Sequence, residues 1–478
     1  MKGFQNDMTA EVTISPRTQT GGNRVLILGG GLAGLAAAKR LVDNGFQVEL
    51  LEKRNILGGK VSSWKDADGD WIETGLHCFF GAYREIYELM KELGTYQHIL
   101  WKKHELTYTL SKGERFVFRT WKLPSPFHLI PAVTSNHYFT LTEMITFTKM
   151  LMPILFGSQK YYAEQDKMTY EEWHQKQGVS KRLLKKMFVP MSLALKFLPP
   201  EDISAKIVID VAGEFLRVPK ASMMGFLKGS PEEYLIAPLA NYIRKKGGKI
   251  HTEAKVATLL YDGEHITGVQ MTNGETLSAD YYLTALPVHN LKKVLPESLK
   301  EKYQFFRNID EFQGVPVITV QLWYDKQISY VDNIMFSPDG VIPFYADMAN
   351  TTPDYAVLRG LTHQGKSRFE FGVAPAKHFI HLSDEEIIAK VDASVRDIFP
   401  ETSKGAKILK HTIVRIPQSV YAAVPGMDAK RPTQKTPVKN LFLAGGYTRN
   451  RFYDSMEGAV ETGNKAAREL MVAHGILA

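Results

Sequence analysis

Apolar and polar positions along the chain follow two periods, one typical of strands and one typical of helices. The first clear unit begins at Arg24, where an apolar run at 25–28 predicts a short strand. Glycines at 29–31 follow, a helical pattern then runs to Leu41, and residues 47–52 alternate as a second strand. The sequence therefore predicts a strand–turn–helix–strand unit, the arrangement of a βαβ motif.

Further elements are predicted along the rest of the chain. Helical patterns occupy 141–156 and 170–197, inside a region at 101–200 that is dense in aromatic residues, methionine and proline. Two later helices are predicted at 384–398 and 456–473. A helix–turn–strand pattern lies at 232–262, and strand-like runs lie at 315–323, 341–347 and 441–444.

The turn after the first strand carries the clearest chemical signal. Its residues fit the spacing G-x-G-x-x-G and are Gly29, Gly30, Gly31, Leu32, Ala33 and Gly34. In this motif the glycines permit a tight turn, close approach of the backbone to a pyrophosphate, and close packing of helix on strand. Glu52 ends the second strand, where a carboxylate accepts hydrogen bonds from a ribose. A glycine turn of an unrelated α/β fold is the alternative, but this context favours dinucleotide binding.

Two further glycine-containing segments indicate that the dinucleotide is FAD. Gly58 and Gly59 follow soon after Glu52, where an extended flavin needs a second close approach of the backbone. Near the C-terminal end, Gly445 and Gly446 lie between a strand and a helix whose N-terminus could face the flavin. Three separated segments therefore agree on one cofactor.

The segments 57–83, 226–239 and 434–460 resemble the plant and cyanobacterial carotene desaturases, the family of the phytoene and ζ-carotene desaturases. The resemblance runs over nearly the whole chain from Arg24 onward, and it places the chain in the FAD-dependent amine-oxidase-like superfamily. It implies that FAD accepts hydride from a lipophilic polyene at a membrane, and that a quinone such as plastoquinone reoxidises the flavin.

The resemblance also implies which residues contact FAD. Carried over position by position, these residues are Ala33, Glu52, Lys53, Lys60, His77, Cys78, Tyr83 and Met456. Arg54 and Val256 complete the expected cofactor site, together with the glycines named above.

At the expected substrate and quinone pocket the chain departs from the family. The family's arginine falls on Glu214, with Arg217 one turn further, and Asp454 is a third candidate in this pocket. Gly446 stands where phytoene desaturases have Asp and ζ-carotene desaturases have a small residue. The stretch 345–348 is more similar to phytoene desaturase. We expect 15-cis-phytoene as the substrate, with ζ-carotene as the alternative.

No catalytic dyad and no metal site is predicted, so the catalytic residues are not assigned. Desaturation needs a hydride acceptor and a proton sink. Flavin N5 supplies the first, and the polyene delocalises the resulting positive charge, so we expect no dedicated strong base. The task of the protein is mainly to position the polyene against the flavin and to exclude water. His77 has two interpretations of equal weight, a hydrogen bond near the flavin or a histidine satisfied by the backbone. Cys78, the only cysteine, is expected to be a small buried hydrophobe.

The expected fold class is α/β, with a Rossmann-like FAD-binding domain, an interleaved mixed-sheet substrate domain and a helical lobe. No repeat or low-complexity linker separates these parts. The predicted boundaries are a flexible tail at 1–22, FAD-binding segments at 23–100, 231–290 and 434–478, a membrane-associated helical lobe at 101–230, and the substrate domain at 291–433.

Charge and composition bear on the partners. Lys and Arg number 59 and Asp and Glu 51, giving a net charge of +8, and the absence of an arginine-rich run argues against nucleic acid. The apolar stretch 121–156 is expected to dock in one leaflet, with a buried helix pair as the alternative. The expected location is therefore peripheral, on a bacterial cytoplasmic or thylakoid membrane, or in a chloroplast, and the oligomeric state is left open.

Two other classes of protein remain as alternatives. An amine-oxidase-like flavoenzyme would act on a polar amine, and a prenyl-lipid escort protein would carry lipid without flavin. The intact glycine motif, Glu52 and the glycine pair after it favour an FAD-dependent oxidoreductase that acts on CH–CH bonds.

Overall fold

The computed structural model describes residues 22–120, 123–125, 127–131, 138–358, 361–362 and 365–477. The predicted N-terminal tail therefore lies almost wholly outside the described residues. So do several positions in the apolar stretch 121–156.

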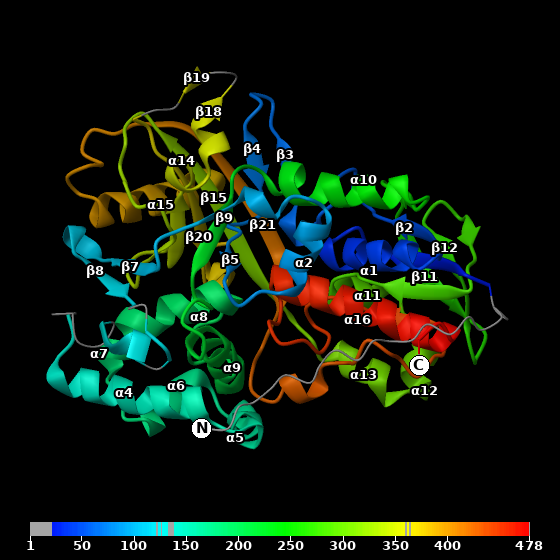
Figure 1. The fold of residues 1–478 in the computed structure, drawn as a ribbon. Coiled ribbons are helices and arrows are strands. Elements are labelled where there is room, and N and C mark those ends of the chain that lie inside the picture. The colour runs from blue at the N-terminus through cyan, green and yellow to red at the C-terminus, as the bar shows by residue number, and fades with distance from the viewer. Residues whose placement is uncertain are drawn as a thin grey trace.

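A five-stranded parallel sheet lies beside the glycine turns (Figure 1). Its strand order is β10 (Lys249–His251), β2 (Gln47–Leu51), β1 (Arg24–Leu28), β14 (Tyr281–Thr284) and β22 (Leu441–Leu443). All four pairings are parallel, with Val25 opposite both Val48 and Tyr281. Strands from the beginning, the middle and the end of the chain thus share one sheet. The boundaries of the FAD-binding segments remain predictions.

Three helices cover this sheet. The first, α1 (Leu32–Asp43), packs between α10 (Ala237–Lys245) and the long C-terminal helix α16 (Met456–His474), as Figure 1 shows. The contact between α1 and α16 is close because Gly463 has no side chain: a Cβ atom there would lie 2.3 Å from the carbonyl oxygen of Ala33. The C-terminal helix therefore lies directly against the helix that follows the first glycine turn.

The second large sheet has seven strands and is mixed. Its order is β21 (Ile408–Tyr421), β15 (Gly314–Tyr324), β20 (Arg368–Val373), β17 (Phe344–Asp347), β16 (Met335–Phe336), β7 (Glu105–Thr109) and β8 (Arg115–Arg119). The β16–β7 pair is parallel and the others are antiparallel. Helix α15 (Asp384–Ile398) packs its apolar side on this sheet and contributes Ile387, Val391 and Val395 to the core.

A helical lobe forms the lower left of the molecule in Figure 1. Its helices are α4 (Leu141–Phe156), α5 (Gln159–Glu164), α6 (Tyr170–Lys176), α7 (Lys181–Leu183), α8 (Val189–Lys196) and α9 (Ala205–Leu216). The prediction of one helix over 170–197 is wrong. Gly178 adopts a left-handed φ of 75°, which ends the first helix, and the Ser180 side chain caps a new one.

The remaining elements are short. The described residues also form four small sheets. Three of them comprise β11 (Val256–Tyr261), β12 (Ile266–Met271) and β13 (Thr276–Leu277); β5 (Phe79–Phe80), β9 (Met224–Leu227) and β6 (Ile99–Trp101); and β3 (Ser63–Lys65) with β4 (Trp71–Glu73). Strands β18 (Val357–Leu358) and β19 (Leu361–Thr362) pair with each other. The other helices are α2 (Glu85–Glu92), α11 (Val288–Val294), α12 (Glu297–Lys302), α13 (Gln304–Asp310) and α14 (Met348–Thr351).

The close packing of α16 on α1 generates a first prediction. Gly463→Ala should lower the melting temperature, because its Cβ would overlap the Ala33 carbonyl and the helices would have to separate, at a cost of about 1–3 kcal/mol. Gly213→Ala on α9 is the comparison variant, because the atoms nearest to its Cβ belong to the Arg217 side chain, at 2.9–3.2 Å, which can shift more readily than a backbone carbonyl. Both changes gain similar helix propensity, so equal melting temperatures would contradict the packing argument.

Candidate cofactor site

The first glycine turn connects β1 to α1 in a conformation that requires glycine. Gly29 has a φ of +107°, and its N–H donates to the Leu51 carbonyl at 2.8 Å. A Cβ atom on Gly34 would lie 2.0 Å from the carbonyl oxygen of Gly29. The turn is therefore as tight as the sequence predicts, and Gly34 lets the helix start directly against it.

The N-terminus of α1 has the features of an anion site. Its N-cap is Gly31, which offers no side-chain cap, and the first turn carries no acidic residue. A Cβ atom on Gly31 would meet only the Cα atom of Gly59, at 3.7 Å, so its backbone is open to close approach. The free N–H groups and the helix dipole favour a phosphate at this position. These residues fit the pyrophosphate of FAD.

Glu52 lies next to this turn, at the end of β2. Its side chain is buried, and its two carboxylate oxygens accept hydrogen bonds from the N–H groups of Gly30 and Arg54, both at 2.9 Å. These bonds fix the orientation of the carboxylate, which keeps further acceptor positions. Glu52 is thus placed to accept from the ribose hydroxyls of a dinucleotide bound at the turn.

The second glycine pair touches the first turn directly. The Gly58 N–H donates to the Gly30 carbonyl at 2.9 Å, and a Cβ on Gly59 would lie 2.9 Å from the Cα of Gly31. Arg54 donates from its guanidinium to the Gly59 carbonyl, also at 2.9 Å. Two segments that the sequence assigned separately to FAD therefore form one continuous backbone surface.

His77 lies beside this surface with both ring nitrogens engaged. Its Nε2 faces the Lys60 carbonyl oxygen at 2.9 Å, and its Nδ1 faces a Glu73 carboxylate oxygen at 2.8 Å. The other Glu73 oxygen accepts from the Tyr355 hydroxyl at 2.6 Å. A carbonyl can only accept, so Nε2 is the donor to Lys60, and Nδ1 pairs with the Glu73 carboxylate. The bond to the Lys60 carbonyl agrees with the interpretation that the backbone satisfies His77. A contact between His77 and the flavin remains a prediction.

The third segment follows β22. Gly445 has a φ of +122°, and its N–H donates to the Thr462 hydroxyl at 3.0 Å. Met456 is the buried first residue of α16, whose N-cap Ser455 accepts from the Gly458 N–H. A Cβ on Gly446 would lie 2.3 Å from an Asp454 carboxylate oxygen. Asp454 is in turn 3.4 Å from the amine of Lys60, which joins this segment to the second glycine pair.

Two other predicted contacts lie in an apolar setting. Burial raises the pKa of the Cys78 thiol to about 12, so the thiol is protonated at neutral pH. Tyr83 is buried against Phe452, with ring centres 5.4 Å apart, and burial raises the pKa of its hydroxyl well above the usual value. Both groups are therefore uncharged at neutral pH.

The remaining predicted site residues lie further out. Arg217 donates to the carbonyls of Ile154 and Leu155 at the end of α4, so it stabilises the helical lobe. Glu214 is half-buried on α9, and Lys53 is exposed. Val256 begins β11, two residues after Ala254, whose N–H donates to the Glu52 carbonyl; it therefore borders the expected ribose end.

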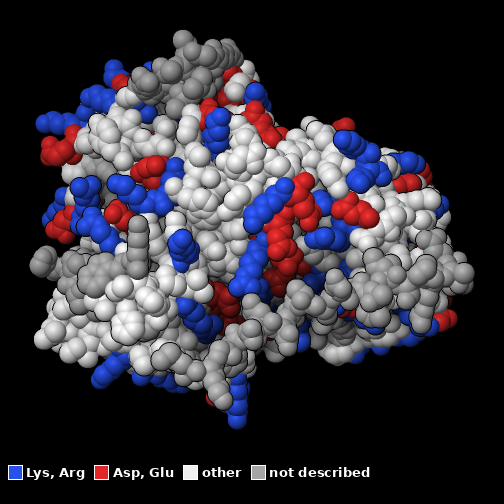
Figure 2. Space-filling view, viewed as in Figure 1, with Lys and Arg blue, Asp and Glu red and all other residues white. Residues whose placement is uncertain are grey.

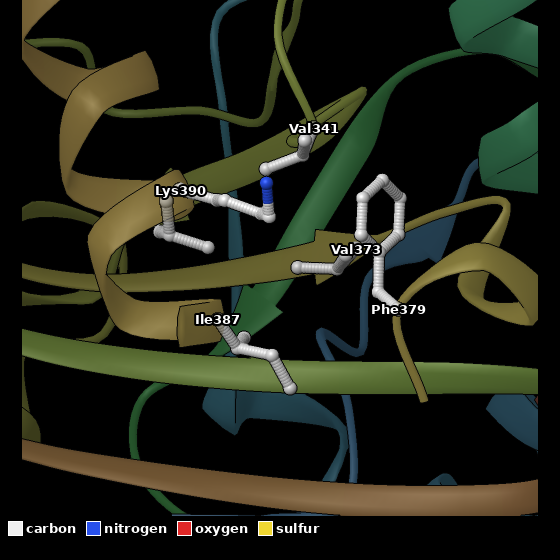
Figure 3. Close-up of a pocket in the computed structure, with 6 residues that line it drawn as sticks. Val341, Val373, Phe379, Ile387 and Lys390 are labelled. Carbon is white, nitrogen blue, oxygen red and sulfur yellow. The ribbon is translucent and has the colours of Figure 1, made fainter. Parts of the chain in front are cut away.

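Two other places in the structure are distinct from the glycine turns. A small hollow between β20 and α15 is lined by five apolar side chains and one lysine (Figure 3). These residues are Val341, Val373, Phe379, Ile387, Val391 and Lys390.

The carboxylates of Asp66, Asp68 and Asp70 surround the Lys410 ammonium at 2.6, 2.8 and 2.6 Å. The lysine thus occupies the centre of this acidic group.

One charged residue at the site was not predicted. Lys196, the last residue of α8, is buried and lies 2.5 Å from Asp454. The sequence contains a signal that could have found it, because it is a lone charge within the apolar run 187–200. An isolated charge in a buried segment requires a partner, and here the partner comes from the opposite end of the chain.

Comparison with known proteins defines the class. The description of the family named flavin containing amine oxidoreductase matches residues 32–471, which include the second and third glycine segments and the end of the first. The chain therefore belongs to this family. FAD as the cofactor and an FAD-dependent oxidoreductase activity, both expected from the sequence, are confirmed at this level.

Within the family, the most informative relatives are desaturases. The chain is 38% identical to 15-cis-phytoene desaturase of Synechococcus elongatus over 460 residues, covering 94% of this chain and 96% of the relative. It is 37% identical to the chloroplastic/chromoplastic enzyme of Arabidopsis thaliana, covering 95% and 81%. It is 35% identical to zeta-carotene desaturase of Synechocystis, covering 94% and 97%. The predicted family resemblance is confirmed.

Solved structures show the same fold at low sequence identity. Putrescine oxidase has a TM-score of 0.74 at 15% identity, with 94% of this chain and 99% of that chain covered. An oxidoreductase from Methanosarcina mazei has a TM-score of 0.69 at 17% identity, with 94% and 100% covered. The predicted α/β fold class is confirmed.

The geometry of Glu52 generates a prediction about cofactor retention. Glu52→Ala should weaken FAD binding at least about tenfold, because it removes a charged acceptor placed for the ribose. Glu49→Ala is the control, since this carboxylate is on the same strand but pairs at 3.7–3.8 Å with exposed Lys249 and Arg24. The measurement is the titration of apoprotein with FAD. Equal affinities in both variants would contradict the assigned role.

Proposed function

We propose that the protein desaturates a lipophilic polyene of the carotenoid class, oxidising 15-cis-phytoene toward ζ-carotene with FAD as the hydride acceptor. The observation that carries this proposal is the extent of the similarity to phytoene desaturase, which covers 94% of this chain. The match therefore spans the helical lobe and the mixed sheet as well as the cofactor segments. When bound, the flavin supplies the acceptor for hydride, and the protein binds, orients and shields the polyene.

A quinone is the proposed electron acceptor. The chain has one G-x-G-x-x-G unit, which the FAD segment uses, so a diffusible acceptor in the same lipid phase as the substrate is the natural candidate. The Arg217 guanidinium donates a hydrogen bond to the Leu155 carbonyl at the end of α4, and Glu214 stands where the family arginine is expected. The quinone would therefore bind through contacts that differ from those of the relatives.

ζ-Carotene is the second candidate substrate. The specific observation in its favour is Gly446, a small residue as in the ζ-carotene desaturases. The Asp454 carboxylate lies in the space that the side chain of a larger residue at position 446 would occupy. The relative named zeta-carotene desaturase also matches over nearly its full length.

The substrate assignment predicts the outcome of an anaerobic reduction experiment. Purified holoprotein in liposomes is mixed separately with 15-cis-phytoene, with ζ-carotene and with putrescine, and the flavin absorbance is followed. Phytoene should bleach the flavin, and a plastoquinone analogue should restore it. Bleaching by ζ-carotene alone would assign the second candidate, and bleaching by putrescine alone would favour an amine oxidase. A purified protein without flavin would favour the escort class.

A membrane contact through α4 is part of the proposal. Four large apolar residues of α4 are spaced four, seven and four residues apart, so they share one face of the helix. They are Leu141, Ile145, Met152 and Phe156. They are 70%, 51%, 54% and 65% exposed. Phe127, 58% exposed, lies in the adjoining segment. Large apolar residues that are exposed together mark a docking surface.

The surroundings of this face suit a position on a lipid surface. Figure 2 shows that the region over α4, at the lower left, is mostly uncharged, with Lys and Arg along its lower edge. Exposed Lys149 and Lys160 are among the basic residues of this part of the chain, and basic residues favour anionic lipid headgroups. Among the described residues, no helix is long and apolar enough to cross a membrane.

The docking surface predicts a loss of vesicle binding when its charge is changed. Ile145→Glu with Phe156→Glu should reduce co-flotation with anionic vesicles at least about tenfold, because burying two carboxylates in the interface is unfavourable. Leu409→Glu is the control, since Leu409 is 57% exposed but lies on β21 of the mixed sheet. Unchanged flotation of the double variant would contradict this surface.

A further inference from the structure

A cluster of charged side chains lies where three distant segments meet, and the proposed reaction assigns no role to Lys196, its innermost member. Lys196 and Asp454 are buried, whereas the Lys60 side chain is 38% exposed. The Lys196 amine lies 2.5 Å from an Asp454 oxygen and 3.7 Å from the centre of the Tyr421 ring. The Lys60 amine approaches the other Asp454 oxygen at 3.4 Å. The side chains of Lys196 and Asp454 are only 1% and 5% exposed.

Each member comes from a different part of the fold. Lys60 follows the second glycine pair, Lys196 ends α8 of the helical lobe, and Asp454 immediately precedes Ser455, the N-cap of α16. The cluster therefore joins the helical lobe to both ends of the cofactor domain. It also borders the C-terminal glycine turn, because the Asp454 carboxylate lies where a side chain on Gly446 would point.

The cluster carries one net positive charge at neutral pH. Burial lowers the pKa of Lys196 to about 8, although Asp454 opposes this effect. Burial alone would raise the pKa of Asp454, but Lys196 and Lys60 bring it down to about 2. Two ammonium groups thus surround one carboxylate. The nearby Arg431 is paired with Asp428 at 3.1 Å, and its positive charge also lowers the pKa values of Lys196 and Asp454.

A purely structural role is a weak explanation for such a cluster. The desolvation of a buried ion pair generally cancels most of its attraction, and apolar replacements of similar volume are often equally stable. Here a second amine is added beside the pair, next to the positive end of α16. The charge distribution favours a negative group in the adjacent site.

We propose that Lys196, held in place by Asp454 and joined by Lys60, supplies the positive charge that stabilises the reduced flavin at the C-terminal glycine turn. A hydride carries two electrons and one proton from a substrate C–H bond, so it adds one negative charge to the flavin. A buried positive charge favours this anion, because electrostatic interactions are stronger away from bulk water. The inference rests on the proposed function, since it requires FAD at this turn.

The test is the midpoint potential of the bound flavin in two variants whose expected shifts have opposite signs. Lys196→Met leaves the Asp454 carboxylate and should lower the ratio of reduced to oxidised flavin at a fixed potential at least about tenfold, which is about 30 mV for a two-electron couple. Asp454→Asn leaves both amines and should raise the ratio by a similar factor. Lys196→Arg keeps the charge and should stay near the wild-type potential.

The control is Lys102→Met, which removes another buried lysine with one carboxylate partner, Asp332 at 2.6 Å. It should leave the potential unchanged. Unchanged potentials in Lys196→Met and Asp454→Asn, or shifts of the same sign, would overturn the proposal even if both variants unfold at lower temperature. If Lys196→Met fails to fold, the test depends on Asp454→Asn alone. An unchanged or lowered midpoint potential in that variant overturns the proposal. A wild-type protein that binds no flavin would instead contradict the proposed function.

Discussion

The whole site depends on backbone segments that approach one another more closely than any side chain would permit. A Cβ on Gly34 would lie 2.0 Å from the Gly29 carbonyl, and one on Gly59 would lie 2.9 Å from the Cα of Gly31. A third such contact places Gly463 of α16 against α1. Because these contacts leave backbone N–H groups and helix N-termini exposed to one region, they provide the surroundings that an extended dinucleotide with two phosphates requires.

This close approach also determines where charge can gather. Once the second glycine pair lies on the first turn, Lys60 is brought to Asp454, and the helical lobe can reach the same place through Lys196. The lobe that carries the exposed apolar face of α4 is thereby connected to the cofactor domain by a buried ion pair. The helical lobe and the cofactor domain thus share one structural junction.

The sequence predicted those features that depend on local patterns. The first turn, Glu52 and the helices at 141–156 and 384–398 were found because periodicity and glycine spacing are local properties. The break at Gly178 was missed because the helical period continues on both sides of it. For Lys196, the apolar run around it indicates a buried charge, but its partner Asp454 is 258 positions away in the sequence, so the local pattern does not identify that partner.

We infer that one FAD is held jointly by three segments of the chain, and amide hydrogen exchange tests this inference most directly. Exchange would be compared between the apoprotein and the protein reloaded with FAD. The structure predicts that FAD slows exchange in all three segments, at 29–35, 57–62 and 445–458, because each presents backbone to the cofactor. Protection confined to 29–35 would contradict the claim.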